Sequence, residues 1–304
     1  MRILFNGQQA FGKAVLEALL NRGEEIVGVY CAPDKPGKKM DVLKEFALSK
    51  NLPVFQPASY KDPQVWEHMK SLNAELGVMA YVLMFVPEEA LAVPTHGTIQ
   101  YHPSLLPWHK GASSINWPII MGKKETGLSI FWPDNGLDTG PILLQKKTKL
   151  SDKDTLGSVY FDRLFPMGVE AMLEAVDLVK AKKAPRIPQD PKAGSYEGWC
   201  RKENAKINWK KPVADVYNLI RGTNPQPGAW TKLKGKTLDV YDCVKVAKRG
   251  GKPGQIVAVA KDSFTVAAKG GQIKVLRVRP EGGPKMSGGD FAREAGLDKK
   301  SKLG

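Results

Sequence analysis

The chain is poor in cysteine and histidine, and this shortage narrows the chemistry that it can perform. Its 304 residues include three cysteines, Cys31, Cys200 and Cys243, and four histidines. The cysteines are odd in number, widely spaced and form no C-x-x-C pair, which argues against a disulfide framework and a cysteine zinc site. None of the histidines has another histidine four residues away or a cysteine at the spacing of a zinc site. We therefore expect a protein of a reducing compartment that uses no metal.

Long hydrophobic runs are also absent. The longest apolar stretch, residues 76–87, is much shorter than the roughly 20 residues that cross a membrane. The amino terminus has one arginine before a very short apolar run, which does not resemble a secretory signal. With 42% hydrophobic and 25% charged residues, the composition is that of an ordinary globular protein. We expect a cytoplasmic protein.

The glycine-rich motifs that bind nucleotide phosphates are missing. Residues 7–12 (GQQAFG) lie between a predicted strand and a predicted helix, where a nucleotide-binding loop would stand. The three-glycine spacing of the dinucleotide fingerprint is not there, and no P-loop sequence occurs. We interpret the segment as the first turn of an α/β sheet and expect no nicotinamide cofactor.

Acidic residues are scarce in the last third of the chain. Residues 201–304 contain 23 Lys and Arg against 9 Asp and Glu, a net charge of +14, while the whole chain carries +15. Charge spread over a domain keeps it soluble and needs no partner. A concentrated positive field also attracts polyanions, nucleic acid among them. Both interpretations stay open.

The first half of the chain alternates strand and helix signals. Apolar, β-branched runs are interspersed with segments of helical spacing, such as residues 11–20 and 41–49. The predicted strands are 2–6, 25–32, 53–55, 76–82, 97–102 and 126–132. Alternation of this kind predicts the α/β class, with a Rossmann-like, mostly parallel sheet and helices on both faces.

A second domain is predicted from the second half of the chain. A long helical stretch, 155–182, with a break expected at Pro166, leads into a proline-rich segment. Beyond that segment lie a short helix and several strands separated by turns, which predict a small barrel or sandwich. We therefore expect a first domain over 1–183, a linker over 184–203 and a basic domain over 204–304.

Gln100, His102 and Asp138 form a candidate site for acid–base chemistry. Side chains alternate along a strand, so Gln100 and His102 project from the same side of 97–102. The prolines that follow end this strand, and ligands of open α/β sheets bind at the carboxyl ends of strands. Asp138 lies in a later loop. An Asp near glycine is also common in turns, where it bonds its own backbone.

An ordered set of motifs resembles the folate-dependent formyltransferase family, which includes methionyl-tRNA formyltransferase and the hydrolase domain of 10-formyltetrahydrofolate dehydrogenase. The resemblance covers almost the whole chain. Its motifs are QYHPSLLP at 100–107, GLDTG at 136–140, MRILFNG at 1–7, IRG at 220–222, PGAW at 227–230 and the segment 286–291. It implies an OB-like barrel for the second domain.

The resemblance also implies a reaction. The formyl donor would be 10-formyltetrahydrofolate, with no metal and no nicotinamide. His102 would act as base, Asp138 would orient it and help to protonate the leaving nitrogen, and Gln100 would hold the oxyanion. The implied folate contacts are Met84, Phe85, Val86, Ser104 and Leu105, although core packing is a serious alternative for residues 80–87.

Gln100 departs from the family pattern. Methionyl-tRNA formyltransferases that resemble this chain carry Asn there, and the hydrolase domain carries an aliphatic residue. Gln keeps the amide donor but places it one methylene farther out, and an oxyanion donor works only when it is accurately placed. Either the site is rearranged to suit Gln100, or turnover relies on His102 and Asp138.

The sequence leaves the formyl acceptor open. The loop 33–40 is short, whereas methionyl-tRNA formyltransferases have a longer basic insertion there, and several segments most resemble the hydrolase domain. These features favour water or a small amine as acceptor. The basic second domain suits initiator tRNA, which is the alternative, or the polyglutamate tail of folate. A weaker alternative is a non-enzymatic RNA-binding protein with a decayed transferase domain.

Overall fold

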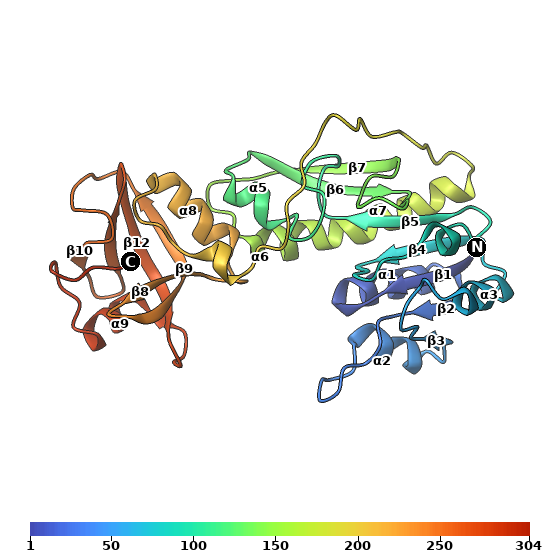
Figure 1. Cartoon of the computed structure of the whole chain (residues 1–304), viewed down its shortest axis with the longest axis horizontal. Coiled ribbons are helices and arrows are strands. Elements are labelled where there is room, and N and C mark those ends of the chain that lie inside the picture. Colours follow the sequence, from blue (N-terminus) through green and yellow to red (C-terminus); the bar gives the residue numbers. More distant parts are fainter. The chain divides into compact units, whose positions relative to one another are not determined.

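The computed structural model describes residues 1–304 and divides into two compact units (Figure 1). Unit 1 consists of residues 1–111, 127–148 and 163–196, and unit 2 consists of 112–126, 149–162 and 197–304. Each unit is thus assembled from segments that are separated in the sequence. The predicted division into 1–183, 184–203 and 204–304 stays a prediction.

Unit 1 is built on a seven-stranded sheet with the order β3-β2-β1-β4-β5-β6-β7. The pairs β1–β2, β2–β3, β1–β4 and β4–β5 are parallel, while β5–β6 is antiparallel. The strands are β1 Arg2–Gly7, β2 Glu25–Tyr30, β3 Val54–Phe55, β4 Leu76–Ala80, β5 Thr98–His102, β6 Glu125–Phe131 and β7 Ile142–Lys149. The predicted mostly parallel sheet is confirmed.

Alternation along the strands produces two hydrophobic clusters, one on each face of this sheet. In β1, Ile3 and Phe5 belong to one cluster and Leu4 to the other, as the period of two in a strand requires. Helices α1, α2 and α7 contribute to the cluster of Ile3, and α3 and α4 to that of Leu4. Their bounds are α1 Gln9–Asn21, α2 Val42–Ser49, α3 Pro63–Ser71, α4 Glu88–Leu91 and α7 Phe165–Lys180. Helices therefore cover both faces.

The predicted helix 155–182 is interrupted before its proline. Helix α6 covers Leu156–Val159, a π-helical segment covers Tyr160–Leu164, and α7 then begins at Phe165. Pro166 lies in the first turn of α7. A proline is tolerated there because the first N–H groups of a helix have no partner within the helix.

Strand β7 was not predicted, because its sequence reads as apolar and then basic. It runs from Ile142 to Lys149 with one glutamine and three lysines among its last five residues, and it lies at the edge of the sheet. Edge strands carry lysines that discourage pairing with other chains. The lysines of this edge strand therefore removed the alternation of apolar and polar residues by which a strand is predicted.

Unit 2 contains a separate sheet with the order β10-β11-β12-β9-β8, and β13 pairs with β12. Its β8–β9, β9–β12, β10–β11, β11–β12 and β12–β13 pairs are antiparallel. The strands are β8 Ala229–Leu233, β9 Lys236–Val246, β10 Ile256–Val259, β11 Phe264–Ala268, β12 Gly271–Pro280 and β13 Met286–Ser287. Besides α6, the helices of this unit are α5 Asn116–Ile120, α8 Val213–Gly222, α9 Gly288–Glu294 and a 3-10 helix over Lys202–Ala205. The predicted strands are confirmed, and the OB-like barrel stays a prediction.

None of the helices combines the length and the apolar character that crossing a membrane requires.

Candidate functional site

The candidate site is built around the carboxyl end of β5. Pro103 follows His102, and because proline has no N–H to continue the sheet, the strand ends there. His102 is 6% exposed, and Gln100, two residues earlier, is half-buried. His102 pairs with Ser129 of β6 and Gln100 with Met79 of β4, so the sheet holds the backbone of both residues.

The two ring nitrogens of His102 face different acceptors. Nε2 lies 2.9 Å from the backbone carbonyl oxygen of His109, and Nδ1 lies 3.6 Å from Oδ2 of Asp138. A carbonyl oxygen only accepts hydrogen bonds, so Nε2 carries a proton. Nδ1 is therefore the nitrogen at which His102 takes up or releases a proton, and a carboxylate stands beside it.

Asp138 is held firmly although it lies in a loop. It is 8% exposed, and its Oδ2 accepts a hydrogen bond of 2.7 Å from the backbone N–H of Gly111. Its backbone is left-handed, with φ of 54°, a conformation that Asp and Asn adopt more easily than most residues. Asp138 therefore makes a contact beyond its own turn, and the carboxylate points at His102.

Close packing at Gly140 fixes the course of this loop. A Cβ atom on Gly140 would lie 1.8 Å from the backbone oxygen of Trp132. The N–H of Trp132 also donates to the carbonyl of Pro141 at 2.9 Å. Only glycine allows the loop to approach the end of β6 this closely, and Asp138 is placed as a result.

The side-chain amide of Gln100 has no hydrogen-bond partner within the protein, whereas His102 and Asp138 are both engaged. A half-buried amide without a partner is available to a ligand. The structure thus brings His102 and Asp138 together and leaves the amide of Gln100 uncommitted on the same strand.

The three predicted folate contacts of residues 84–86 differ in their surroundings. Met84 is half-buried and lines a small hollow with Gly7, Gln8 and Tyr60. Phe85 is 51% exposed. Val86 is buried in the hydrophobic cluster on the α3 face of the sheet. Met84 and Phe85 are accessible to a ligand, while the side chain of Val86 is part of the core.

Ser104 and Leu105 are engaged in local packing. Ser104 is fully buried, and its hydroxyl donates a hydrogen bond of 2.7 Å to the carbonyl of Trp108. Leu105 is half-buried, and its side chain lies so close to Gly127 that a Cβ atom there would be 2.7 Å away. The hydroxyl of Ser104 shapes the turn after β5, and its predicted contact with folate stays a prediction.

Sequence reasoning missed two residues, Gln189 and Ser195, because both lie in the segment interpreted as linker. The amide of Gln189 donates to the carbonyls of Asp138 at 3.0 Å and Gly140 at 2.7 Å. The hydroxyl of Ser195 accepts from the N–H of His109 at 3.0 Å. Prolines and mixed charge in the sequence gave no signal of these contacts, since they depend on residues about 50 to 86 positions away.

His68 lies in the packing of the α3 face. The hydroxyl of Tyr30 and Nδ1 of His68 are 2.7 Å apart, and the His68 ring lies 4.3 Å from that of Phe55. Burial raises the pKa of the Tyr30 hydroxyl, which therefore stays protonated and donates to His68.

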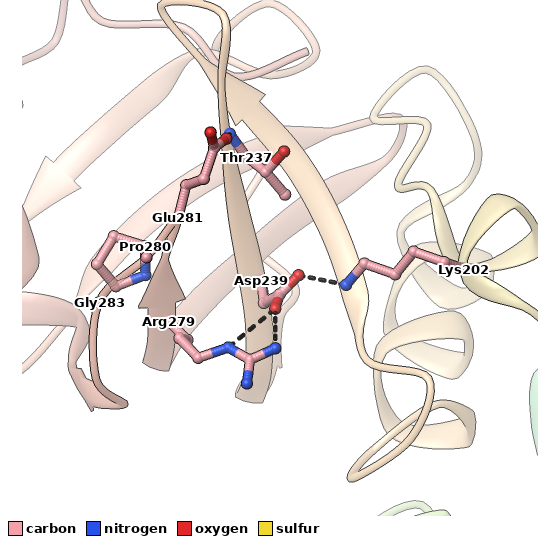
Figure 2. Close-up of a pocket in the computed structure, with 8 residues that line it drawn as sticks. Lys202, Thr237, Asp239, Arg279, Pro280, Glu281 and Gly283 are labelled. Carbon is pink, nitrogen blue, oxygen red and sulfur yellow. Dashed lines mark hydrogen bonds and ion pairs between the residues drawn. The ribbon is translucent and has the colours of Figure 1, made fainter. Parts of the chain in front are cut away.

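A larger hollow of about 420 Å³ lies in unit 2 (Figure 2). Asp239, one of its lining residues, is paired with Lys202 and with Arg279, whose Nη2 lies 2.7 Å from the carboxylate. The hydrogen bond to Asp239 raises the pKa of Arg279. The remaining charged residue of the lining, Glu281, accepts a hydrogen bond of 2.7 Å from the backbone N–H of Thr237, and no residue of the candidate site lines the hollow.

No group of three or more His, Cys, Asp or Glu side chains is arranged to hold a metal ion. The chemistry available at the carboxyl end of β5 is proton transfer by His102 beside a carboxylate.

Comparison with known proteins adds relatives of two kinds. The mitochondrial 10-formyltetrahydrofolate dehydrogenase of Mus musculus is 44% identical over 246 residues, 79% of this chain and 26% of that protein. The cytosolic enzyme of Homo sapiens is 45% identical over 247 residues, 80% of this chain and 27% of that protein. The chain thus spans about a quarter of the length of these relatives. Methionyl-tRNA formyltransferase of Pelotomaculum thermopropionicum is 36% identical over 301 residues, 96% of this chain and 95% of that protein.

Solved structures share the fold at low identity. HypX from Aquifex aeolicus, in complex with tetrahydrofolic acid, has a TM-score of 0.68 at 18% identity and covers 97% of this chain and 47% of its own. An N-formyltransferase from Helicobacter canadensis, with folinic acid and dTDP-3-aminofucose, has a TM-score of 0.71 at 18% identity and covers 90% of this chain and 98% of its own.

Two family models match the chain. Residues 1–176 match the formyl transferase model, and residues 200–296 match that of the formyl transferase carboxyl-terminal domain. Together with the full-length match to a methionyl-tRNA formyltransferase, these matches show that the chain belongs to the formyltransferase family.

Proposed function

We propose that the chain removes the formyl group from 10-formyltetrahydrofolate, passes it to water or a small amine, and releases tetrahydrofolate. The observation that carries this proposal is the buried His102–Asp138 pair, with Nδ1 facing the carboxylate at 3.6 Å. The 44–45% identity to 10-formyltetrahydrofolate dehydrogenases, against 36% to a methionyl-tRNA formyltransferase, supports water or a small molecule as acceptor.

In the proposed reaction, the nucleophile attacks the formyl carbon, and the bond from that carbon to N10 of the folate breaks. Nδ1 of His102 takes the proton of the nucleophile, because Nε2 is committed to the carbonyl of His109. The carboxylate of Asp138 stabilises the positive charge on the imidazole, and the proton then passes to N10. The amide of Gln100 donates to the developing oxyanion.

The folate is proposed to lie beside the segment that contains Met84 and Phe85. Met84 lines the small hollow at the end of β1, and Phe85 is exposed next to it in the chain. The solved structure of HypX with tetrahydrofolic acid supports a folate ligand for this fold. At 18% identity, the likeness extends to the fold only.

The test is the rate of tetrahydrofolate release from 10-formyltetrahydrofolate, with and without methionyl initiator tRNA. We expect release without tRNA and no acceleration when it is added. The variants His102→Ala and Asp138→Asn should each lower kcat about 10²- to 10⁴-fold, because each removes a proton-transfer partner. Asn is chosen at position 138 because it tolerates the left-handed backbone and still accepts from Gly111. Full activity of His102→Ala would refute the assignment.

Methionyl-tRNA formyltransferase activity is the second candidate. Its support is the match over 96% of the chain and 95% of the bacterial enzyme, together with the net charge of +14 over residues 201–304. In that case tetrahydrofolate release would appear only with methionyl-tRNA, and binding would weaken steeply as salt is raised, since each phosphate contact releases counterions.

A further inference from the structure

Residues 185–195, the strap, are anchored to unit 1 at their beginning. The indole N–H of Trp132 donates to the carbonyl of Pro185 at 2.9 Å, and the Arg186 guanidinium lies 3.8 Å from the centre of the Trp132 ring. Ile187 and Ile142 exchange two backbone hydrogen bonds, of 2.8 and 3.0 Å. The strap has no helix and no strand of a sheet, yet its first residues are fixed.

Gln189 connects the strap to the loop of Asp138. Its Nε2 donates to the carbonyls of Asp138 and Gly140, on either side of Thr139. This defines the orientation of the amide, because a flipped amide would place Oε1 against two carbonyl oxygens. Oε1 itself is buried without a partner. A buried acceptor without a partner is unfavourable. The two hydrogen bonds that Nε2 donates hold the side chain in this position despite that cost.

Ser195 connects the other end of the strap to His109, whose carbonyl oxygen accepts the hydrogen bond from Nε2 of His102. Its hydroxyl accepts from the N–H of His109, its N–H donates to the carbonyl of Pro107 at 3.2 Å, and its carbonyl accepts from the N–H of Lys110 at 2.9 Å. Gly194 is required for this approach, since a Cβ atom there would lie 2.1 Å from the oxygen of Pro107.

The strap therefore holds both of the residues that the ring nitrogens of His102 face. Nδ1 faces Asp138, whose backbone is held by Gln189, and Nε2 donates to His109, whose backbone is held by Ser195. We propose that Gln189 and Ser195 are positioning residues, which set the orientation of the His102 imidazole without contacting the reacting atoms. The proposal rests on the proposed function for its effect on catalysis.

The first test is kinetic. Gln189→Met keeps the length of the side chain and removes both donated bonds. It should lower kcat about 10- to 100-fold with KM for 10-formyltetrahydrofolate nearly unchanged, because a displacement of about 1 Å has that cost. Gln64→Met, at an exposed glutamine in α3, is the matched control and should have no effect. If Gln189→Met lowered only the melting temperature and left kcat unchanged, its role would be structural and the proposal wrong.

Ser195 has a conservative variant. Ser195→Thr keeps the hydroxyl that accepts from His109, and Ser195→Ala removes it. We expect Ser195→Ala to lower kcat by about tenfold and Ser195→Thr to restore most of it. Equal activity of the two variants would remove Ser195 from the proposal.

A second readout does not depend on turnover. The chain has four histidines, so the two ¹⁵N ring signals of His102 in labelled protein can be assigned by the loss of that pair in His102→Gln. Gln189→Met should shift the His102 signals and leave those of His68, held by Tyr30, in place. Unchanged His102 signals would overturn the proposal. Shifted His102 signals in a protein that releases no tetrahydrofolate would uphold the positioning role and refute the proposed function instead.

Discussion

His102 illustrates how one side chain acquires a defined chemical role from its surroundings. It is buried at the end of a strand, with Nε2 hydrogen-bonded to a carbonyl and Nδ1 next to a carboxylate. The carbonyl determines which nitrogen carries the proton, and the carboxylate lies beside the other nitrogen. An imidazole arranged in this way can accept a proton and pass it on.

Gln100 is the residue whose role is most open to a direct measurement. Its amide has no partner in the protein, so we expect it to serve the oxyanion of the formyl transfer. Gln100→Leu should lower kcat about 10²-fold with little change in KM, which is the usual effect of removing one oxyanion donor. A Gln100→Leu enzyme with wild-type kcat would make Gln100 a bystander and leave the reaction to His102 and Asp138.

Glu24 is a buried charge whose contribution to stability depends on pH. Its side chain is 1% exposed and forms ion pairs with Lys180 at 2.6 Å and with the Met1 amino group at 2.9 Å. Burial by itself raises the pKa of Glu24, but the hydrogen bonds from Lys180 and the amino terminus outweigh burial and lower the pKa below its usual value.

A lowered pKa in the folded state means that Glu24 stabilises the protein above its unfolded-state pKa and that this contribution is lost as the pH falls through the folded-state value. We expect Glu24→Gln to lower the free energy of unfolding by about 1–3 kcal/mol near neutral pH, since a buried partner is lost. The difference from wild type should narrow below about pH 4. Urea unfolding at both pH values measures it, and Glu67→Gln, in an exposed pair, is the control. A difference independent of pH would contradict the ion-pair account.

At the scale of elements, the site depends on loops that are fixed by strands and by the strap. The loop after β6 carries Asp138, and it is held on one side by Trp132 and on the other by Gln189. Its conformation is therefore set by close packing, although it has no regular structure of its own.

The packing of this loop leads to a prediction at Gly140. Gly140→Ala places a Cβ atom 1.8 Å from the backbone oxygen of Trp132, so the loop must move. We expect at least about a tenfold loss of kcat through displacement of Asp138 and a destabilisation of about 1–3 kcal/mol from overpacking. Gly198→Ala is the control, because a Cβ atom there meets nothing within 4 Å. Equal behaviour of the two variants would show that the loop adapts freely.

At the scale of the whole molecule, the two compact units do not divide at one point of the chain. Unit 2 includes residues 112–126 and 149–162. Buried Asn116 of α5 donates to the carbonyls of Gly222 at 2.9 Å and Gln226 at 3.2 Å, and Arg221 donates to the carbonyls of Ser151 and Asp154. These segments are stabilised by residues after position 200.

We therefore expect a fragment of residues 1–200 to be less stable than the full chain. The amide of Asn116 would lose both acceptors, and α5 would lose its packing against α8. A loss of this kind, about 1–3 kcal/mol for each buried group left unpaired, should lower the melting temperature by about 5–10 °C. Scanning calorimetry of the fragment and the full chain makes the comparison. A fragment with the melting temperature of the full chain would show that α5 needs no support.

From the sequence alone follow the strands β1 to β6, the helices α1 and α2 and the antiparallel strands of unit 2, because hydrophobic periodicity and turn residues are local signals. The sequence also points to His102, Asp138 and Gln100 through their motifs. It did not reveal β7, whose edge position allows lysines, or the break of the long helix at Tyr160–Leu164 before Pro166.

Only the tertiary structure decided which nitrogen of His102 faces Asp138 and which residues hold the pair. The carbonyl of His109, the N–H of Gly111 and the side chains of Gln189 and Ser195 meet there from distant parts of the chain. Such contacts leave no periodic pattern in the sequence, since each depends on where the folded backbone brings a single donor or acceptor. Local periodicity thus determined the elements, and long-range packing determined the geometry of the site.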